Sequence, residues 1–373
     1  MSNLVTYAQN LVYTLLCLMP SLYQKNSLRT LLGLFLEARG QALPQHSETV
    51  SPSALSRFLN QYNWSCRAVI RAVRTQIVGQ IQAESRCGRR AILQVILDMT
   101  CLEKEGKFKG LGKLIRVYNG KRGLHLVVLY IQLGERRLPW GFRVYRGRGE
   151  RSHIQLAQRL LLSLPKTITQ RFEVRILADS AFGSTEMLKW VKQRKRTSAI
   201  LGVSCDRRLA DGRHVGDLLH QGQQVYLWGV DFPVTLSWYW LVKDDGTREK
   251  RFVVSTKPLS GVYITLLGKR RWLIEGFFKT AKHRFSLHRF GQCTVKGVYR
   301  WLVLSLIAYF LAHLACLWSG MTTLPDWAVA SRLAQETLFP SVVVLSLLIG
   351  IKRYQHLVRT QGLNISVTGW QFG

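Results

Sequence analysis

One acidic residue lies among several cations in the segment RRWLIEGFFKTAKHRF, residues 270–285. On a helix, offsets of 4 and 11 residues return to nearly the same face, so Arg271, Glu275 and Lys282 would lie within about 40° of one another. An i,i+4 ion pair on a solvated face explains this spacing, and such a pair stabilises a helix by only about 0.3 kcal/mol. A carboxylate that binds metal, beside cations that bind phosphate, explains it equally well. The segment alone does not distinguish the two interpretations.

Two further acids stand out because each ends an apolar run that is typical of a buried strand. Asp98 ends QVILD and Asp179 ends RILAD. A carboxylate at such a position is costly to bury unless a cation or metal holds it, although each acid alone could be a turn or helix-cap residue. Three carboxylates suit a two-metal site for displacement at phosphorus. We therefore predict Asp98, Asp179 and Glu275 as catalytic ligands of two Mg²⁺ or Mn²⁺ ions.

The charge balance indicates an anionic partner. The 373 residues contain 53 Lys and Arg against 21 Asp and Glu, a formal net charge of +32, while 47% hydrophobic content supports a folded core. So large an excess is typical of proteins that bind nucleic acid, and less often of membrane-binding proteins. We predict double-stranded DNA as the partner, with no nucleotide cofactor because no Walker A motif is present. Besides 270–285, the cations gather at 86–90, 104–116, 143–151 and 192–196.

Location can be predicted from the cysteines and from one apolar run. The seven cysteines are scattered without a C-x-x-C pair, which favours reduced thiols in a cytoplasmic protein. The run WLVLSLIAYFLAHLACLW, residues 301–318, has the minimum length of a membrane span, but it contains His313 and Ser305 in a basic chain. We expect a buried core helix and no membrane partner, with a spanning helix as the alternative. A DNA-binding protein of this kind would be cytoplasmic and associated with the nucleoid.

The pattern of elements predicts an α/β fold with helical flanks. Residues 1–85 have helical spacing, and Ser51-Pro52 can begin a short helix that precedes another from Ser65, as in a helix-turn-helix. From Ala91 we expect three strands, a helix, a fourth strand and a helix, then a β-rich insertion at about 199–257. Helices then resume at 261–285 and continue through the apolar run to PSVVVLSLLIGIKRYQHLV. The predicted domains are a helical N-terminal domain at 1–88 with possible DNA binding, a catalytic core at 89–320 and a C-terminal helical segment at 321–373.

These acids and cations resemble those of bacterial insertion-sequence transposases of the DDE type. The resemblance is to the branch with a Tyr-x2-Arg-x3-Glu-x6-Lys (YREK) signature, whose last three elements match Arg271, Glu275 and Lys282. The tyrosine position is Gly268, which departs from the pattern. The run Asp179-Ser180-Ala181-Phe182 is similar to the small and aromatic residues that follow the family's second aspartate. The likeness covers about residues 90–315.

The resemblance implies a ribonuclease-H-like mixed-sheet core with the acids on the first strand, the fourth strand and a late helix. It implies cleavage at transposon ends to give a 3′ hydroxyl, strand transfer into target DNA, and a homodimer in the synaptic complex. Some members stack a flipped base on an aromatic of the insertion, where Trp228, Trp238 and Trp240 are candidates by location. Our expected DNA contacts are Arg271, Lys279, Lys282 and Trp238.

Two other functions remain open on the sequence. A two-metal nuclease with the same core would cut DNA without joining it, and inverted repeats beside the gene would argue against it. A transposase remnant that binds DNA without catalysis would keep the basic surface, although the intact set of three acids argues against that.

Overall fold

The computed structural model describes residues 2–37, 44–84, 90–106, 108, 110–112, 114–242, 245–321 and 326–364. Most of the 86–90 cation cluster, Cys87, part of the 104–116 cluster and the last nine residues of the C-terminal segment lie outside the described residues. The chain forms two compact units, one of Met1–Ala72 with Ala281–Gly373 and one of Val73–Thr280. The domain boundaries predicted at 88 and 320 are a different division and stay a prediction.

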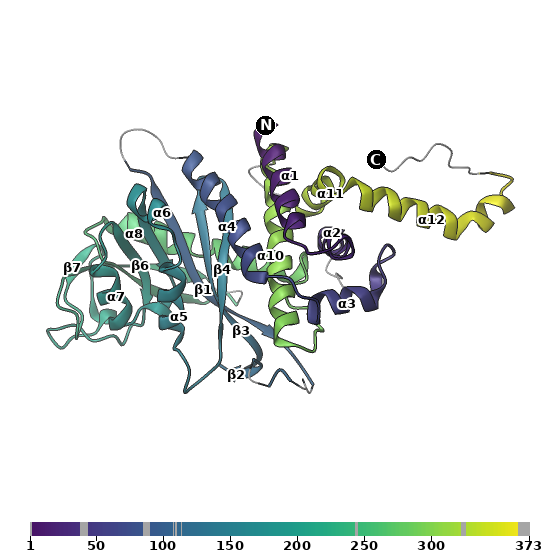
Figure 1. The fold of residues 1–373 in the computed structure, drawn as a ribbon. Helices are drawn as coiled ribbons and strands as arrows, with labels where there is room; N and C mark the ends of the chain where they lie inside the picture. The colour runs from purple at the N-terminus through teal and green to yellow at the C-terminus, as the bar shows by residue number, and fades with distance from the viewer. Residues whose placement is uncertain are drawn as a thin grey trace. The chain divides into compact units, whose positions relative to one another are not determined.

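The Val73–Thr280 unit is built on one mixed sheet, whose strands lie side by side in Figure 1. Long runs of branched and aromatic residues favour strands here, and the turns between them contain glycines with positive φ, such as Gly120 and Gly134. The described strands are β1 (Ile92–Glu103), β2 (Arg116–Tyr118), β3 (Lys121–Leu133), β4 (Arg136–Tyr145), β5 (Glu173–Ala178), β6 (Thr197–Val203), β7 (Gln223–Val225), β8 (Val234–Val242) and β9 (Arg248–Ser255).

The strand order confirms the predicted mixed α/β sheet. Strand β1 pairs antiparallel with β3 and parallel with β5, β4 pairs with β3, and β5 is parallel to β6. Strands β9, β8 and β7 then extend the same sheet beyond β6 by antiparallel pairing. The first residues of the β-rich insertion expected at about 199–257 lie in β6, where Ala199, Ile200 and Leu201 pair with β5.

The strands carry the acids differently from the prediction. Asp98 does not end its strand, because β1 continues to Glu103 with Asp98 opposite Val128 of β3. The end of the apolar run QVILD was taken as the strand end, yet β3 also pairs with Thr100 and Cys101 beyond it. Strand β5 does end at Ala178, so Asp179 directly follows it as predicted.

Helices pack on the sheet and complete this unit. Helix α5 contacts β3 and β4, α7 contacts β6, and α8 contacts β8 and β9. Residues 270–285 were expected on one helix, but α9 begins at Leu273 and Arg271 is the C-terminal cap of the preceding helix, α8. The helices here are α5 (His153–Leu161), α6 (Lys166–Arg171), η2 (Ser180–Phe182), α7 (Thr185–Lys192), η3 (Val215–Asp217), α8 (Gly261–Arg270) and α9 (Leu273–His283). Helices α4 (Cys66–Ala83) and α9 run across the division between the units.

The other unit is helical, as predicted for its N-terminal part. Ser51 caps α3 by accepting a hydrogen bond from the Ala54 N–H, with Pro52 in the first turn. Inside the unit, the buried guanidinium of Arg300 donates to the carbonyl oxygens of Phe58, Leu59, Tyr62 and Trp64, which ties α10 to the end of α3. Its other helices are α1 (Ser2–Cys17), α2 (Leu22–Glu37), η1 (Pro44–His46), α3 (Pro52–Asn60), α10 (Val295–Trp318), α11 (Trp327–Leu338) and α12 (Pro340–Thr360).

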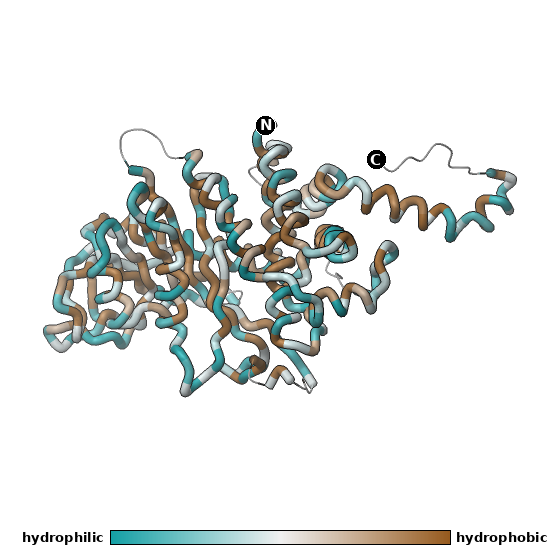
Figure 2. Tube along the Cα trace, in the orientation of Figure 1, coloured by the Kyte–Doolittle hydropathy of each residue, from teal (hydrophilic) through white to brown (hydrophobic). Residues whose placement is uncertain are grey.

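Two helices of this unit, α10 and α12, are long and apolar enough to cross a membrane by length and composition. Of the most apolar part of α10, 89% is buried in the protein, so the predicted core helix is confirmed. Figure 2 shows α12 as apolar in its first half and polar in its second, and none of it is buried.

Candidate active site

Asp98 is a buried carboxylate in the middle of the sheet. Its side chain accepts hydrogen bonds from the Met99 N–H at 2.7 Å and from Nη1 of Arg271 at 3.0 Å. Burial and the nearby charge of Asp179 raise the pKa of Asp98 to about 7, although Arg271 and the Met99 N–H oppose this. The site therefore holds more negative charge than its single close cation compensates.

Asp179 lies beside Asp98 because of the parallel pairing of β1 and β5. In that register Leu97 is opposite Ala178, and the next residue of each strand is an aspartate. Asp179 caps η2, and its Oδ1 accepts the Ala181 N–H at 3.1 Å. Burial raises the pKa of Asp179, against the opposing effect of Arg271 and of backbone N–H groups.

Glu275 enters the site from the first turn of α9. Its Oε1 lies 3.4 Å from Nη1 of Arg271, which is the i,i+4 pair expected from the sequence. Partial burial raises the pKa of Glu275; Arg271 opposes this effect and the charge of Asp179 adds to it. The charge of Asp179 thus raises the pKa of both Asp98 and Glu275.

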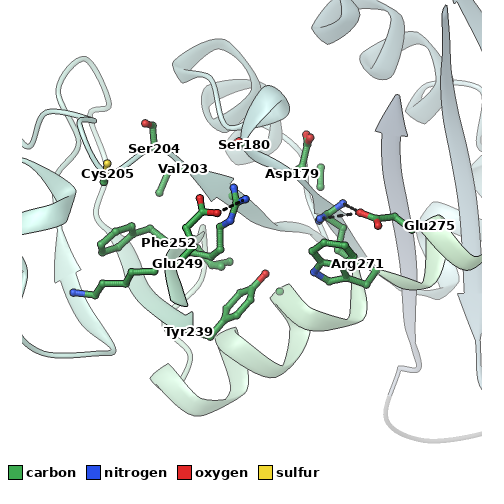
Figure 3. Close-up of a pocket in the computed structure, with 17 residues that line it drawn as sticks. Asp179, Ser180, Val203, Ser204, Cys205, Tyr239, Glu249, Phe252, Arg271 and Glu275 are labelled. Atoms are coloured by element: carbon green, nitrogen blue, oxygen red, sulfur yellow. Dashed lines mark hydrogen bonds and ion pairs between the residues drawn. The ribbon is translucent and has the colours of Figure 1, made fainter. Parts of the chain in front are cut away.

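Arg271 is the cation at the centre of this arrangement. It joins Asp98 on β1 to Glu275 on α9, and its side chain is 14% exposed. Figure 3 shows its guanidinium directed at Glu275, with Asp179 nearby in the same pocket. The pocket has a volume of about 400 Å³. Arg271 and Glu275 do form the i,i+4 ion pair, but Arg271 also pairs with Asp98, so the pair is part of a three-acid group rather than an isolated surface pair.

The carboxylates are not arranged as a finished metal site. Among the described residues, no group of three His, Cys, Asp or Glu side chains surrounds one metal position. Metal binding would require rotation of these side chains, because Arg271 now occupies the space between Asp98 and Glu275.

The other predicted site residues lie outside this three-acid group. Lys279 is exposed on α9, one turn after Glu275. Lys282 is in the last turn of α9, within the unit that begins at Ala281. Trp238 is only 8% exposed and packs against Phe252 and the ammonium of Lys250, so it is part of the core of the β8–β9 hairpin.

Two of the tryptophans of the predicted insertion are exposed. Trp228 is 67% exposed and lines a second pocket with Arg208 and Ser180, while Trp240 is 56% exposed. Trp238 and Trp240 are two residues apart and share one face of β8, so strand alternation could not distinguish them. Their exposure follows position along the strand, which is buried up to Trp238 and more exposed beyond it.

Gly268, at the position of the signature tyrosine, is enclosed by the sheet. A Cβ on Gly268 would lie 3.0 Å from Cγ2 of Val253 and 3.3 Å from the ring of Tyr239. Tyr239 also lines the pocket that contains Arg271, and Figure 3 shows it beside α8. Side chains of β8 and β9 therefore fill the space that a longer residue on α8 would need.

Replacing Gly268 by tyrosine should destabilise the protein. Because Val253 and Tyr239 are already in contact range, we expect Gly268→Tyr to reduce the free energy of unfolding by about 1–3 kcal/mol, the usual effect of overpacking. Chemical denaturation measures this. Gly276→Ala on α9 is the matched control: a Cβ there meets nothing within 4 Å, so helix propensity should make this variant equal to or slightly more stable than the parent. Equal stability of Gly268→Tyr and the parent would contradict the packing argument.

Sequence reasoning missed the residues that contact the turn after Asp179. His153 donates to this turn from α5, and Arg207 donates to it from the segment after β6. His153 follows Ser152 at a helix start and Arg207 is in the basic segment Arg207-Arg208, so neither has a local signal that separates it from ordinary surface residues.

A mixed sheet with carboxylates at a pocket, in a strongly basic chain, is typical of enzymes that act on nucleic acid. The chain belongs to the transposase DDE domain family, whose model matches residues 90–311. This family comprises transposases, which act on DNA and generally use divalent metal ions. No curated protein matches the chain. Among solved structures, the chain is similar to the cryo-EM structure of the piggyBac transposase synaptic complex with hairpin DNA, with 13% identity, a TM-score of 0.47, and coverage of 99% of this chain and 84% of that chain.

Proposed function

We propose that this protein is a DNA transposase that cleaves element ends and transfers strands through Asp98, Asp179 and Glu275. The observation that supports this most strongly is the approach of the three carboxylates around Arg271 in a chain of the transposase DDE domain family. The proposal includes a ribonuclease-H-like core, supported by three antiparallel strands (β4, β3, β1) followed by two parallel to β1 (β5, β6).

The donor set fits two Mg²⁺ or Mn²⁺ ions. Hard carboxylate oxygens are the ligands these ions prefer. Burial chiefly raises the pKa of Asp98, and the charge of Asp179 raises it further, a repulsion that a divalent cation would offset. When bound, the ions would lower the pKa of the attacking water or hydroxyl and stabilise the leaving oxygen at phosphorus. Asp98, Asp179 and Glu275 would hold them.

Arg271 would contribute to DNA binding from the same place. Its guanidinium has five N–H donors, and those directed at Asp98 and Glu275 leave others able to bind a phosphate oxygen. Lys279 and Lys282 add positive charge along α9, the helix that carries Glu275. Of the three tryptophans named as candidates, Trp228 is the most exposed, so it is better placed for stacking on a base than the buried Trp238.

The finer assignments rest on the sequence resemblance. They are the YREK branch, a bacterial insertion sequence, a homodimer that brings two DNA ends together, and association with the nucleoid. The departure at Gly268 leaves the Arg271, Glu275 and Lys282 spacing intact.

Replacing Lys279 by glutamine should weaken DNA binding in a salt-dependent way. Because Lys279 is exposed and would contact phosphate, we expect the slope of log affinity against log salt concentration to fall by about 1 for Lys279→Gln. Fluorescence anisotropy with a labelled duplex over a KCl series measures it. Arg213→Gln is the control, since Arg213 already pairs with Asp211 at 2.7 Å. An unchanged slope for Lys279→Gln would remove Lys279 from the interface.

The function itself is tested with the DNA that flanks the gene. A marker placed between the two flanking sequences should be excised and joined to target DNA by the purified protein with Mg²⁺ or Mn²⁺, and not with EDTA. Cutting without joining would favour the nuclease alternative. Binding without cutting, in both metals, would favour the non-catalytic remnant.

A further inference from the structure

The turn that carries Asp179 is hydrogen-bonded from two sides by residues that do not belong to the three acids. The turn comprises η2, Gly183 and the start of α7. Its first peptide groups determine where the Asp179 carboxylate points, because Oδ1 accepts the Ala181 N–H at 3.1 Å. A rotation of the Ala181 peptide would therefore move or release the carboxylate.

His153 binds the next peptide group of the turn, Ala181–Phe182, through the Ala181 carbonyl. Its Nε2 lies 2.8 Å from the Ala181 carbonyl oxygen. A carbonyl can only accept, so Nε2 carries the hydrogen and donates. The imidazole also packs edge-on against Phe182, with ring centroids 5.5 Å apart. Asp179 thus accepts from the Ser180–Ala181 peptide group, and His153 donates to the following Ala181–Phe182 peptide group, whose Phe182 N–H also hydrogen-bonds the Asp179 carboxylate.

The backbone of His153 is itself fixed. Ser152 caps α5 and forms a reciprocal capping box with Gln155, so the first residue of the helix has a defined position. The ring of Tyr145 at the end of β4 lies against His153, with centroids 6.3 Å apart. The donor therefore comes from a rigid helix start rather than from a loop.

Arg207 holds the other end of the turn. Its Nη1 donates to the Gly183 carbonyl oxygen at 3.1 Å and its Nη2 to Oγ1 of Thr185 at 2.7 Å. The backbone of β6 packs directly against the turn, since a Cβ on Gly202 would come within 2.7 Å of the Ser180 nitrogen. Direct backbone contact at Gly202 and two donors from Arg207 leave the turn little freedom.

We propose that His153 and Arg207 are positioning residues that fix the Asp179 carboxylate for metal binding. They act through the Ala181 and Gly183 carbonyls. This inference rests on the proposed metal site. Residues that orient a metal ligand through hydrogen bonds typically change metal affinity or activity 10–100-fold when replaced.

The test is Mn²⁺ affinity, measured by electron paramagnetic resonance on the full-length protein without DNA. His153→Phe keeps an aromatic ring against Phe182 and Tyr145 but removes the donor, and we expect about tenfold weaker Mn²⁺ binding. His153→Gln keeps an N–H donor at a similar distance from the backbone and should bind within about threefold of the parent. Gln158→Ala, which removes only the α5 contact to Glu186, should bind like the parent.

Arg207→Lys supplies a second, independent variant. It retains the charge but cannot donate to Gly183 and Thr185 together, so it should also weaken Mn²⁺ binding about tenfold. Circular dichroism establishes that each variant is folded. In a cleavage assay, His153→Phe should lower kcat and leave KM for DNA unchanged.

The outcomes separate this inference from the proposed function. If Asp179→Asn binds Mn²⁺ as the parent does, the proposed metal site is wrong. If binding depends on Asp179 but folded His153→Phe and Arg207→Lys bind like the parent, the positioning role is overturned. A loss in His153→Phe that His153→Gln does not restore would also overturn it, because the hydrogen bond would then not be the cause.

Discussion

Glu275→Gln is expected to abolish strand cleavage, at least a thousandfold in rate, while leaving folding and DNA binding intact. Glutamine has nearly the same shape and can still accept from Arg271, but it removes the negative charge that a divalent cation needs. Glu275 is only partly buried, so the loss of its charge should disturb the fold little. Single-turnover cleavage of a duplex carrying the element end, with anisotropy for binding and circular dichroism for folding, measures the three properties separately.

Glu249→Gln is the matched control for this prediction. Glu249 lines the same pocket, but it pairs with Arg251 at 3.0 Å and lies on β9, outside the three acids. Its replacement should change the cleavage rate by less than about threefold. Cleavage by Glu275→Gln at the parent rate would remove Glu275 from the metal site and make the basic, non-catalytic protein the better description.

The fold was predictable where pattern and local chemistry agree. The apolar runs of β1 and β5 each contain or precede an aspartate, and parallel pairing places those aspartates next to each other. Ser51 capping α3 and the buried α10 were likewise predicted, because a cap and a long apolar helix have strong local signals. Such features depend on residues near one another in the chain.

The remaining features depend on contacts between distant residues. The bond from Arg271 to Asp98 spans 173 residues of sequence, and no spacing rule predicts it. The absence of a tyrosine at 268 has its reason in Val253 and Tyr239 on other elements. The role of His153 becomes visible only when α5 is placed against the turn after β5. The break between α8 and α9 at Arg271 was also missed, since no glycine or proline lies at residues 270–275 to indicate it.

Asp98→Asn is expected to stabilise the protein at pH 8 in the absence of divalent ions. The pKa of Asp98 rises from 3.8 to about 7 on folding, chiefly because of burial. The folded state therefore binds this proton more tightly than the unfolded state, so the favourable contribution is complete below about pH 4 and is lost as the pH rises through 7. The shift corresponds to at most about 4 kcal/mol, and we expect asparagine to recover about 2 kcal/mol.

Thermal unfolding at pH 4 and pH 8 in EDTA tests this prediction, because the gain in Tm for Asp98→Asn should be present at pH 8 and nearly absent at pH 4. Asp211→Asn is the control of opposite sign. A hydrogen bond from Arg213 lowers the pKa of Asp211, so replacing Asp211 should reduce Tm if it changes it, and the reduction should be present at pH 8 rather than at pH 4. The same Asp98→Asn variant should not cleave DNA. A gain in stability together with a loss of activity would mean that the charge of Asp98 serves function rather than stability. A loss of stability at pH 8 would instead mean that the ion pair with Arg271 outweighs burial and repulsion from Asp179.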